Sequence, residues 1–319
     1  MSKDLKLARS VRVAVFSFFL LTVLYGLSII WLSKSAPMGL ERYNSKVIFL
    51  VISLTIFSWF IRGIRWWWLI RSLDIKVQLF KSLYVYIAGF AFTATPGKVG
   101  ELMRARYLNT SIECSKSVFA AFVFERFMDL LVVLMLGVIF FYNTQYVGIG
   151  IAFIAVVIGV ITMLIFLVQG PFFARRDIID RGLLNRFVRA IVWLQASVDA
   201  GKKWMNFRDL SISILCGFVA WGSLSLAFVV MLFQFAPSVD CSEALGVYPL
   251  AMVVGAASFI PGGIGSTEAA IVALLTDIGI VTELAIAVAV GIRVSTLWLA
   301  VMIGLIVAIK FELELAKAE

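Results

Sequence analysis

Histidine is absent from the chain, and cysteine and charged residues are scarce. The 319 residues contain no histidine, three cysteines and only 15% Asp, Glu, Lys and Arg. Without histidine, the protein lacks the commonest general base, the commonest transition-metal ligand and the usual pH switch near neutrality. Cys114, Cys216 and Cys241 have no zinc-type spacing and are too few for a disulfide framework. We therefore expect no metal site and no cofactor.

Apolar residues are in large excess. They make up 62% of the chain, and the mean hydropathy is +1.02. A soluble domain is about half apolar and about one quarter charged, so this composition indicates an integral membrane protein. The net charge of +9 falls in short segments between apolar runs. Basic residues in such places mark the cytoplasmic side and contact anionic headgroups, so the bilayer is the expected partner and nucleic acid is not.

The long apolar runs predict about six transmembrane helices. They lie at residues 13–32, 47–61, 117–142, 147–168, 210–235 and 284–309. The segment 170–208 carries eight Lys and Arg residues, and its apolar positions recur at helical spacing. It is predicted to be a cytoplasmic, basic and amphipathic connector on the inner leaflet. By the positive-inside rule, both termini are also cytoplasmic, in the plasma (inner, cytoplasmic) membrane.

Two further segments do not fit a simple span. Residues 79–95 are followed by Pro96 and Gly97, and then by a stretch too highly charged to face lipid. Residues 244–260 end at Pro261-Gly262-Gly263, and residues 266–276 follow. Each is predicted to enter the membrane as a half-helix, break at Pro-Gly and return as a second half-helix. The predicted fold class is an all-α polytopic membrane protein with about six spans plus two re-entrant half-helix hairpins.

The two breaks form an internal repeat. Pro96-Gly97-Lys98-Val99-Gly100, followed by Glu101, recurs as Pro261-Gly262-Gly263-Ile264-Gly265, followed by Glu268. With one copy opening from each side, the chain is a single membrane domain, residues 1–319, with inverted halves at about 47–142 and 210–309. Substrate then lies at the midplane, where two half-helix N-termini favour an anion such as phosphate. The alternative is that both Pro-Gly pairs are simple kinks.

Several charged residues fall inside apolar runs. Arg293 lies near the bilayer centre, where it needs a substrate or a carboxylate such as Glu268 or Glu125. In the run 117–142, Glu125 shares a helix face with Asp129, and Arg126 can reach Asp129 at i, i+3. These three residues bind substrate or form an internally neutralised strut.

Charges near the first break have alternative roles as well. Glu101 and Arg104 share one face of the returning half-helix, and Glu101 is also a candidate cap. Arg62 and Arg65 precede an aromatic cluster that marks the cytoplasmic interface. Both could be interfacial anchors, and for Arg65, which directly precedes three Trp residues, the anchor is the expectation.

In this order, the motifs resemble the flippase-like membrane family. That family includes the transmembrane region of lysyl-phosphatidylglycerol synthase/flippases and dolichol-phosphate glucose synthetase-like membrane proteins. The resemblance covers essentially the whole chain, although Lys98 stands where the family commonly has Gly or Arg, and Ser266-Thr267 precede the second Glu. It implies translocation of an anionic phospholipid or a polyprenyl-phosphate-linked glycolipid between leaflets. Because the chain ends at Glu319, we expect no aminoacyl-transferase domain and no lysyl transfer.

The leading expectation is therefore a flippase and not an enzyme. No Walker A motif is present, so ATP hydrolysis is not expected. The alternatives are a membrane glycosyl- or phospho-transferase, or a non-catalytic lipid-presenting subunit that partners a cell-envelope synthesis enzyme. The candidate substrate-binding residues are Arg62, Pro96, Gly97, Lys98, Gly100, Glu101, Arg104, Glu125, Arg126, Asp129, Pro261, Gly262, Gly263, Gly265, Glu268 and Arg293.

Overall fold

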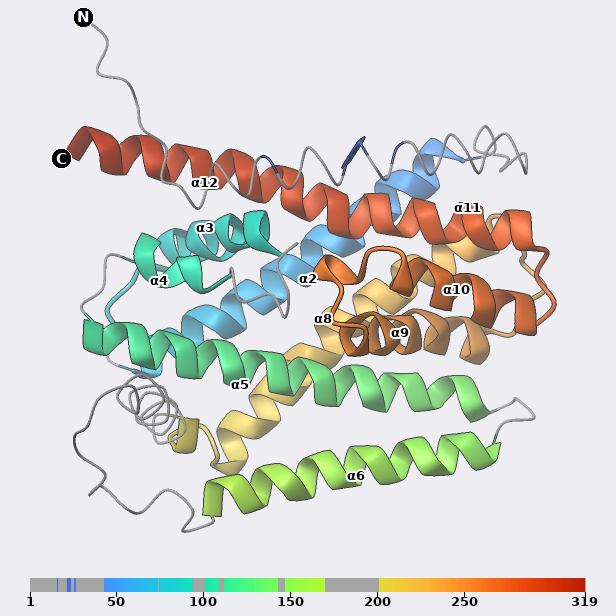
Figure 1. Cartoon of the computed structure of the whole chain (residues 1–319), viewed down its shortest axis with the longest axis horizontal. Coiled ribbons are helices and arrows are strands. Elements are labelled where there is room, and N and C mark those ends of the chain that lie inside the picture. Colours follow the sequence, from blue (N-terminus) through green and yellow to red (C-terminus); the bar gives the residue numbers. More distant parts are fainter. Residues whose placement is uncertain are drawn as a thin grey trace, which may run out of the picture.

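The computed structural model describes residues 43–73, 75–93, 101–108, 112–142, 147–169 and 201–318, together with residues 16, 22, 23 and 26. All regular structure within these residues is helical (Figure 1). The predicted first span at 13–32 lies almost wholly outside the described residues, as does most of the connector 170–208. The candidate residues Pro96, Gly97, Lys98 and Gly100 also lie outside them.

The first part of the chain contains three long helices, with short ones between the first two. Helix α2 (Ser45–Ser72) begins after Asn44, whose side chain accepts a hydrogen bond from the Lys46 backbone N–H at 2.9 Å. The elements that follow are α3 (Leu79–Gly89), the 3₁₀ turn η2 (Phe90–Phe92), α4 (Met103–Tyr107), α5 (Ile112–Gly137), the 3₁₀ turn η4 (Val138–Tyr142) and α6 (Val147–Gln169).

The second part begins with the same order, a long helix followed by two shorter ones and then another long helix. Helix α8 (Phe207–Phe233) starts after Asn206, and α9 (Cys241–Ala257) starts after Asp240, each with a side-chain cap on a backbone N–H. The elements that follow are the 3₁₀ turn η6 (Pro261–Gly263), α10 (Ser266–Asp277), α11 (Thr282–Arg293), the π-helical turn η7 (Val294–Trp298) and α12 (Leu299–Ala318). The last three form one long helix.

Among the described residues, three helical stretches are long and apolar enough to cross a membrane. They are α2, α8 and the combined helix from Thr282 to Glu314. The all-helical membrane class is therefore confirmed, while the arrangement as six spans and two re-entrant hairpins stays a prediction. Helix α2 also extends beyond the predicted end at Ile61, because the aromatic and basic residues that follow continue the helix.

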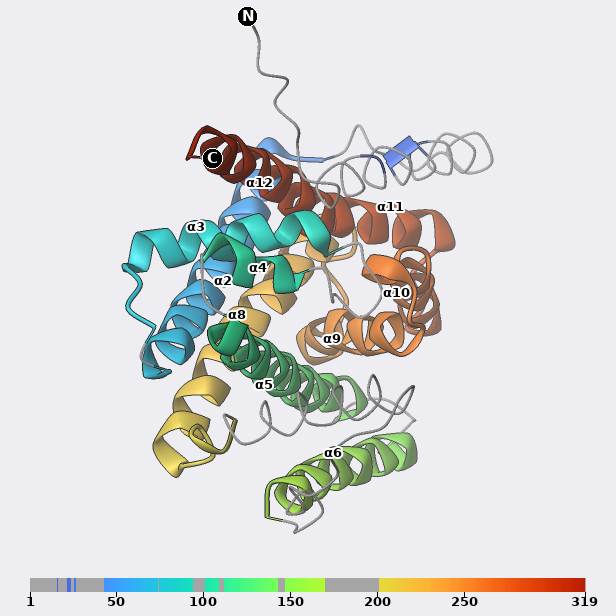
Figure 2. The ribbon, with the colours of Figure 1, turned by 60° about the vertical axis from the view of Figure 1, so that its left-hand side comes forward.

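Each half supplies a long helix that packs on the other half. Helices α2 and α8 lie side by side and antiparallel at the centre, α5 packs on α9, and α12 packs on α3 (Figures 1 and 2). Gly304 of α12 lies so close to η2 that an added Cβ would be 2.4 Å from the Ala91 backbone N. Gly137 of α5 has the matching place, where an added Cβ would be 3.0 Å from Leu250 of α9. Glycine thus permits both close approaches.

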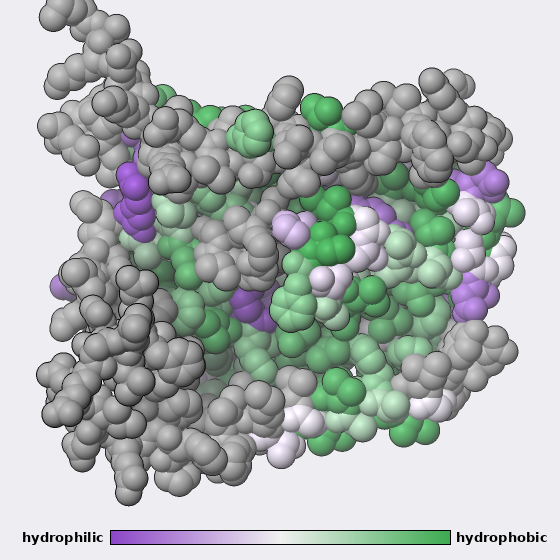
Figure 3. All heavy atoms as spheres, in the orientation of Figure 1, coloured by the Kyte–Doolittle hydropathy of each residue, from purple (hydrophilic) through white to green (hydrophobic). Residues whose placement is uncertain are grey.

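The outer surface suits contact with lipid. Figure 3 shows hydrophobic residues over most of the described surface in that view. Large exposed apolar side chains include Phe49, Phe80, Phe207 and Ile306. Exposed apolar surface on this scale is costly in water and favourable in a bilayer. The charged side chains described next lie inside the helical bundle instead.

Candidate functional site

Seven charged side chains meet where α2, α4 and α5 pack together. We call them the arginine cluster; its members are Arg62, Arg65, Glu101, Arg104, Glu125, Arg126 and Asp129. Helical spacing explains the convergence, because residues three or four apart lie on one face of a helix. Six of the seven are candidates named from the sequence, and Arg65 is the addition.

Arg65 lies at the inner side of the cluster. Its Nη2 donates a hydrogen bond to Asp129 Oδ1 at 2.5 Å and lies 3.5 Å from Glu125 Oε1, and its Nη1 donates to the Ser213 carbonyl at 3.4 Å. The residue is only 1% exposed. The expectation that Arg65 is an interfacial anchor is therefore wrong. The cause is the continuation of α2, which carries Arg65 inward against α5 and α8.

Arg104 is enclosed as completely as Arg65. It donates to Glu101 Oε2 at 2.6 Å and to Glu125 Oε2 at 3.2 Å. Its guanidinium carbon lies 4.1 Å from the ring centroid of Tyr86, whose hydroxyl donates to Glu125 Oε1 at 2.9 Å. Gly89 makes room for the side chain, since an added Cβ would be 2.3 Å from Arg104 Nε. Arg65 and Arg104 therefore hold the cluster together.

Arg62 and Arg126 lie at the edge of the cluster. Arg62 Nη2 is 3.6 Å from Asp129 Oδ2. Arg126 Nη2 is 3.1 Å from Glu125 Oε1 and 3.5 Å from Asp129 Oδ2, so the predicted contact between Arg126 and Asp129 is confirmed. Neither Nε atom has a hydrogen-bond acceptor among the described residues. The Nε atoms of Arg65 and Arg104 lack one as well. Arg62 and Arg126 are distinguished instead by their longer contacts with Asp129 Oδ2.

The second Pro-Gly segment forms a compact turn between α9 and α10. Gly262, Gly263 and Gly265 have φ values of 65°, 63° and 83°, a region that favours glycine. Helix α9 ends at Ala257 and α10 begins at Ser266. The predicted break at Pro261 is thus present in the structure.

Glu268 and Arg293 form hydrogen bonds that stabilise this turn. Glu268 Oε2 accepts a hydrogen bond from the Gly265 backbone N–H at 2.8 Å, and its Oε1 accepts from Arg293 Nε at 3.0 Å. Arg293 Nη2 donates to the Gly262 carbonyl at 2.5 Å. Arg293 thus pairs with Glu268, one of the two roles considered for it, and its role in binding substrate stays a prediction. The Glu268 carboxylate also accepts the hydrogen bond of the Gly265 N–H, which is a donor at the start of α10.

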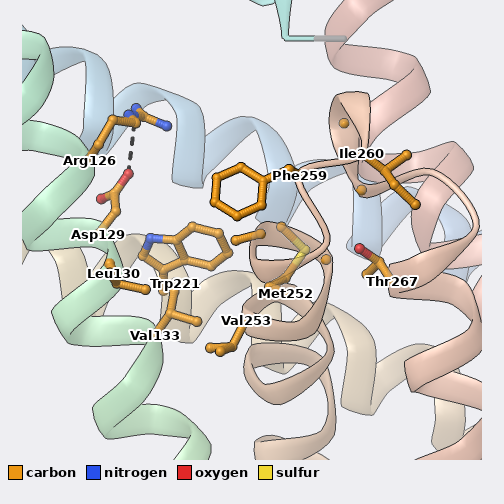
Figure 4. A pocket seen from close by; sticks show the side chains of 14 residues that line it. Arg126, Asp129, Leu130, Val133, Trp221, Met252, Val253, Phe259, Ile260 and Thr267 are labelled. Carbon is orange, nitrogen blue, oxygen red and sulfur yellow. Dashed lines mark ion pairs between the residues drawn. The ribbon is translucent and has the colours of Figure 1, made fainter. Parts of the chain in front are cut away.

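A wide cavity of about 270 Å³ lies between α5, α8, α9 and the tip of the second hairpin (Figure 4). Arg126 and Asp129 line it at one end, and Phe259 and Thr267 lie toward the other, across Trp221. Most of its wall is apolar, with Leu130, Val133, Met252, Val253, Ala256 and Ile260. The cavity thus combines one charged end with a long apolar wall.

A second, narrow cavity of about 70 Å³ lies beside the first. It brings together Arg62 and Glu101 from the first half with Arg293 from the second half. Trp221 and Met252 line both cavities. Predicted site residues far apart in the sequence therefore share one cavity, whereas Arg104 and Glu125 line neither of the two.

Corresponding positions of two long helices line the two cavities. Residues of α5 line the wide cavity, and residues of α11, η7 and α12 line the narrow one. The pairs are Arg126 and Arg293, Asp129 and Thr296, Leu130 and Leu297, and Val133 and Ala300. The members of each pair are 167 residues apart, as are Glu101 and Glu268. These pairs therefore share one spacing, which is two residues longer than the 165 residues between the Pro-Gly segments at Pro96 and Pro261.

The sequence reasoning missed Trp221 and Thr267. The indole of Trp221 faces the Arg62 guanidinium, 5.0 Å from its carbon, and its buried Nε1 has no hydrogen-bond partner among the described residues. Buried Thr267 Oγ1 likewise lacks one there. The available signal for Trp221 was its place in the middle of an apolar run, since Trp prefers the membrane interfaces. Thr267 offered the weaker signal of following the second Pro-Gly break.

These features define a multi-pass, all-helical membrane protein with a buried charged network beside two cavities. The family model described as "Lysylphosphatidylglycerol synthase TM region" matches residues 8–304, and the chain belongs to this family. Two archaeal relatives are each 24% identical. A UPF0104 membrane protein of Methanothermobacter thermautotrophicus aligns over 313 residues, covering 91% of this chain and 92% of its own length. UPF0104 membrane protein PH1989 of Pyrococcus horikoshii aligns over 295 residues, covering 84% and 88%.

Proposed function

We propose that the protein moves an anionic lipid, either a phospholipid or a polyprenyl-phosphate-linked glycolipid, between the leaflets of the cytoplasmic membrane. The observation that carries the proposal is the pair of cavities, which are lined at matching positions of two halves and each contain an arginine. The membership in a family named for a lipid synthase's membrane region supports a lipid-related role.

The proposed halves, about 47–142 and 210–309, are related as an inverted repeat. Two features support this relation: the recurring element order and the reciprocal packing of α5 on α9 and α12 on α3. Transporters built from inverted repeats place the substrate between broken helices and expose it to each side in turn. One cavity here is wide and its counterpart is narrow. This difference is expected of a transporter that opens its substrate site to one side of the membrane at a time.

We place the lipid phosphate at the arginines rather than at the start of α10. The Gly265 N–H is already bonded to Glu268, whereas Arg62 and Arg126 line the two cavities and lie 3.6 and 3.5 Å from Asp129 Oδ2. A guanidinium group binds phosphate through paired hydrogen bonds. The apolar wall of the wide cavity then accommodates the first part of a lipid chain, and the rest of the chain remains in the bilayer.

The test is lipid movement in liposomes that contain the purified protein. A fluorescent anionic lipid is followed with a quencher restricted to the outer leaflet. We expect the protein to accelerate movement, and Arg126→Gln and Arg293→Gln to reduce it at least about tenfold, because each removes a charged hydrogen bond. Arg71→Gln is the matched control, since Arg71 is exposed near the end of α2.

Three results would count against a flippase. The first is a rate no faster than in protein-free liposomes. The second is lipid binding without movement, which would favour a lipid-presenting subunit. The third is product formation from a nucleotide-sugar, which would favour a membrane transferase.

A further inference from the structure

Phe259 has a backbone conformation that its side chain disfavours. Its φ is 55°, and among the described residues it is the one non-glycine residue with positive φ. In this region the Cβ atom crowds the following carbonyl, so glycine is the usual occupant. The same turn has glycine at three other positions of positive φ, Gly262, Gly263 and Gly265. A phenylalanine therefore stands where glycine would cause less strain.

Hydrogen bonds on both sides of Phe259 fix this conformation. The Ile260 backbone N–H donates to Ser258 Oγ at 3.2 Å. Ser258 Oγ donates to the Gly255 carbonyl at 2.7 Å and lies 2.9 Å from Ser266 Oγ. The strained residue thus lies between two anchored neighbours. Strained backbone that the surrounding contacts hold in place is a feature of functional positions.

Burial within the chain does not offset the strain. Phe259 is 79% exposed, and the nearby apolar residues Val254 and Ile260 are 48% and 45% exposed. By contrast, Trp221, which lines the same cavity, is 5% exposed. The phenyl ring would therefore gain from contact with an apolar molecule outside this chain.

These exposed side chains lie at the depth of the hydrocarbon core. Figure 1 shows the turn between α9 and α10 near the middle of the length of α5 and of the long helix from Thr282 to Glu314. That long helix is one of the stretches that are long and apolar enough to cross a membrane. Side chains exposed halfway along it would contact lipid chains and not water.

Phe259 also lines the wide cavity. It lies across Trp221 from Arg126 and Asp129, which form the charged end (Figure 4). Phe259 and Ile260 both line the cavity and are exposed on the outer surface. The wide cavity thus runs from charged side chains inside the bundle to an apolar opening that faces lipid.

We propose that Phe259 stands at a lateral opening of the wide cavity and contacts the hydrocarbon chain of a lipid whose headgroup lies at Arg126. The proposal rests on the proposed function, because the occupant is the lipid that the same site would move. An acyl chain and a prenyl chain both offer the apolar surface that a phenyl ring packs against. The left-handed backbone at Phe259 fixes the direction of its Cβ and so determines where the ring meets the chain.

Photo-cross-linking tests this contact in the full chain. Benzoylphenylalanine, a photoreactive amino acid, replaces Phe259, and the protein is placed in phosphatidylcholine nanodiscs with a minor fraction of phosphatidylglycerol or of a polyprenyl phosphate. Mass spectrometry identifies the lipid in each adduct. We expect one of the anionic lipids to be enriched in the adducts at least about fivefold over its share of the bilayer, because its headgroup is held at Arg126. Which lipid is enriched distinguishes an acyl from a prenyl cargo.

The same amino acid at Phe49 is the matched control. Phe49 is 73% exposed on α2 and is not among the residues that line the two cavities. We expect its adducts to follow the composition of the bilayer. Arg126→Gln removes the charged hydrogen bond to the headgroup, and we expect it to abolish the enrichment at position 259 only. Adducts at position 259 without enrichment, or an enrichment that Arg126→Gln does not reduce, would overturn the proposal.

A second variant leaves every arginine in place. Phe259→Gly relieves the strain, so we expect a higher unfolding temperature. We also expect several-fold weaker binding in nanodiscs of fluorescent phosphatidylglycerol or polyprenyl phosphate, whichever is enriched, because the ring is lost. Phe259→Leu keeps an apolar side chain and should retain most of the binding, as should Phe207→Ala, at an exposed phenylalanine outside the two cavities. Unchanged binding in Phe259→Gly would also refute the contact.

The lateral opening and the flippase can fail separately. Selective adducts at position 259 in a protein that moves no lipid would remove the flippase and keep the opening, as expected of a lipid-presenting subunit. Lipid movement together with unselective adducts would keep the flippase and remove Phe259 as a contact of the cargo.

Discussion

Glu125 offers the sharpest test of what holds the arginine cluster together. Its side chain is fully buried and contacts Tyr86, Arg104, Arg126 and Arg65 at 2.9, 3.2, 3.1 and 3.5 Å. Glu125→Gln keeps the shape but leaves two uncompensated positive charges inside the bundle. Breaking a buried ion pair from one side costs about 3–5 kcal/mol. At roughly 2 °C per kcal/mol for a chain of this size, the unfolding temperature should fall by about 6–10 °C.

Thermal unfolding in detergent, followed by tryptophan fluorescence, measures the change. Glu314→Gln, at an exposed carboxylate near the end of α12, is the matched control and should change stability by less than about 0.5 kcal/mol. Adding Arg104→Met to Glu125→Gln removes the matching charge and should recover part of the loss. A single variant that unfolds like the wild type, or a double variant whose losses simply add, would refute the view that uncompensated charge is the cause.

Three further variants test the packing and the turn. Gly304→Ala should lose about 1–3 kcal/mol of stability, because its Cβ would meet backbone atoms of η2, whereas Gly222→Ala has open space and should gain up to about 1 kcal/mol. Gly262→Ala has room for a Cβ but a φ of 65°, so we expect a loss of about 1 kcal/mol. Thr267→Val should change the unfolding temperature little and weaken lipid binding several-fold, because Oγ1 has no protein partner among the described residues to lose. Unfolding curves check the three glycine variants. Competition with a fluorescent phosphatidylglycerol for the protein in nanodiscs checks Thr267→Val.

Local features of the site could be predicted from the sequence. The break at Pro261 and the pair of α9 and α10 follow from the residues at the break, because proline and glycine act within a few positions of themselves. The contact between Arg126 and Asp129 follows from helical spacing alone. Pairing of Arg293 with Glu268 could be named as one of two options, since an arginine near the bilayer centre needs a substrate or a carboxylate.

Contacts that depend on how helices cross could not be predicted in this way. Arg65 pairs with Asp129 only because α2 continues inward and packs beside α5. The place of Trp221 between the two cavities depends on the packing of α8 against α2 and α9. A sequence gives the side chain and its helix face but not the partner helix, so both residues looked like ordinary aromatic or interfacial positions.

The reciprocal packing of the two halves has a consequence for synthesis. Helix α3 emerges early from the ribosome, yet its packing partner α12 is among the last elements to be made. Helix α3 must therefore remain without this cover until α12 has been made. A translation product interrupted before α12 would contain every residue of the arginine cluster but would lack the helix that packs on α3.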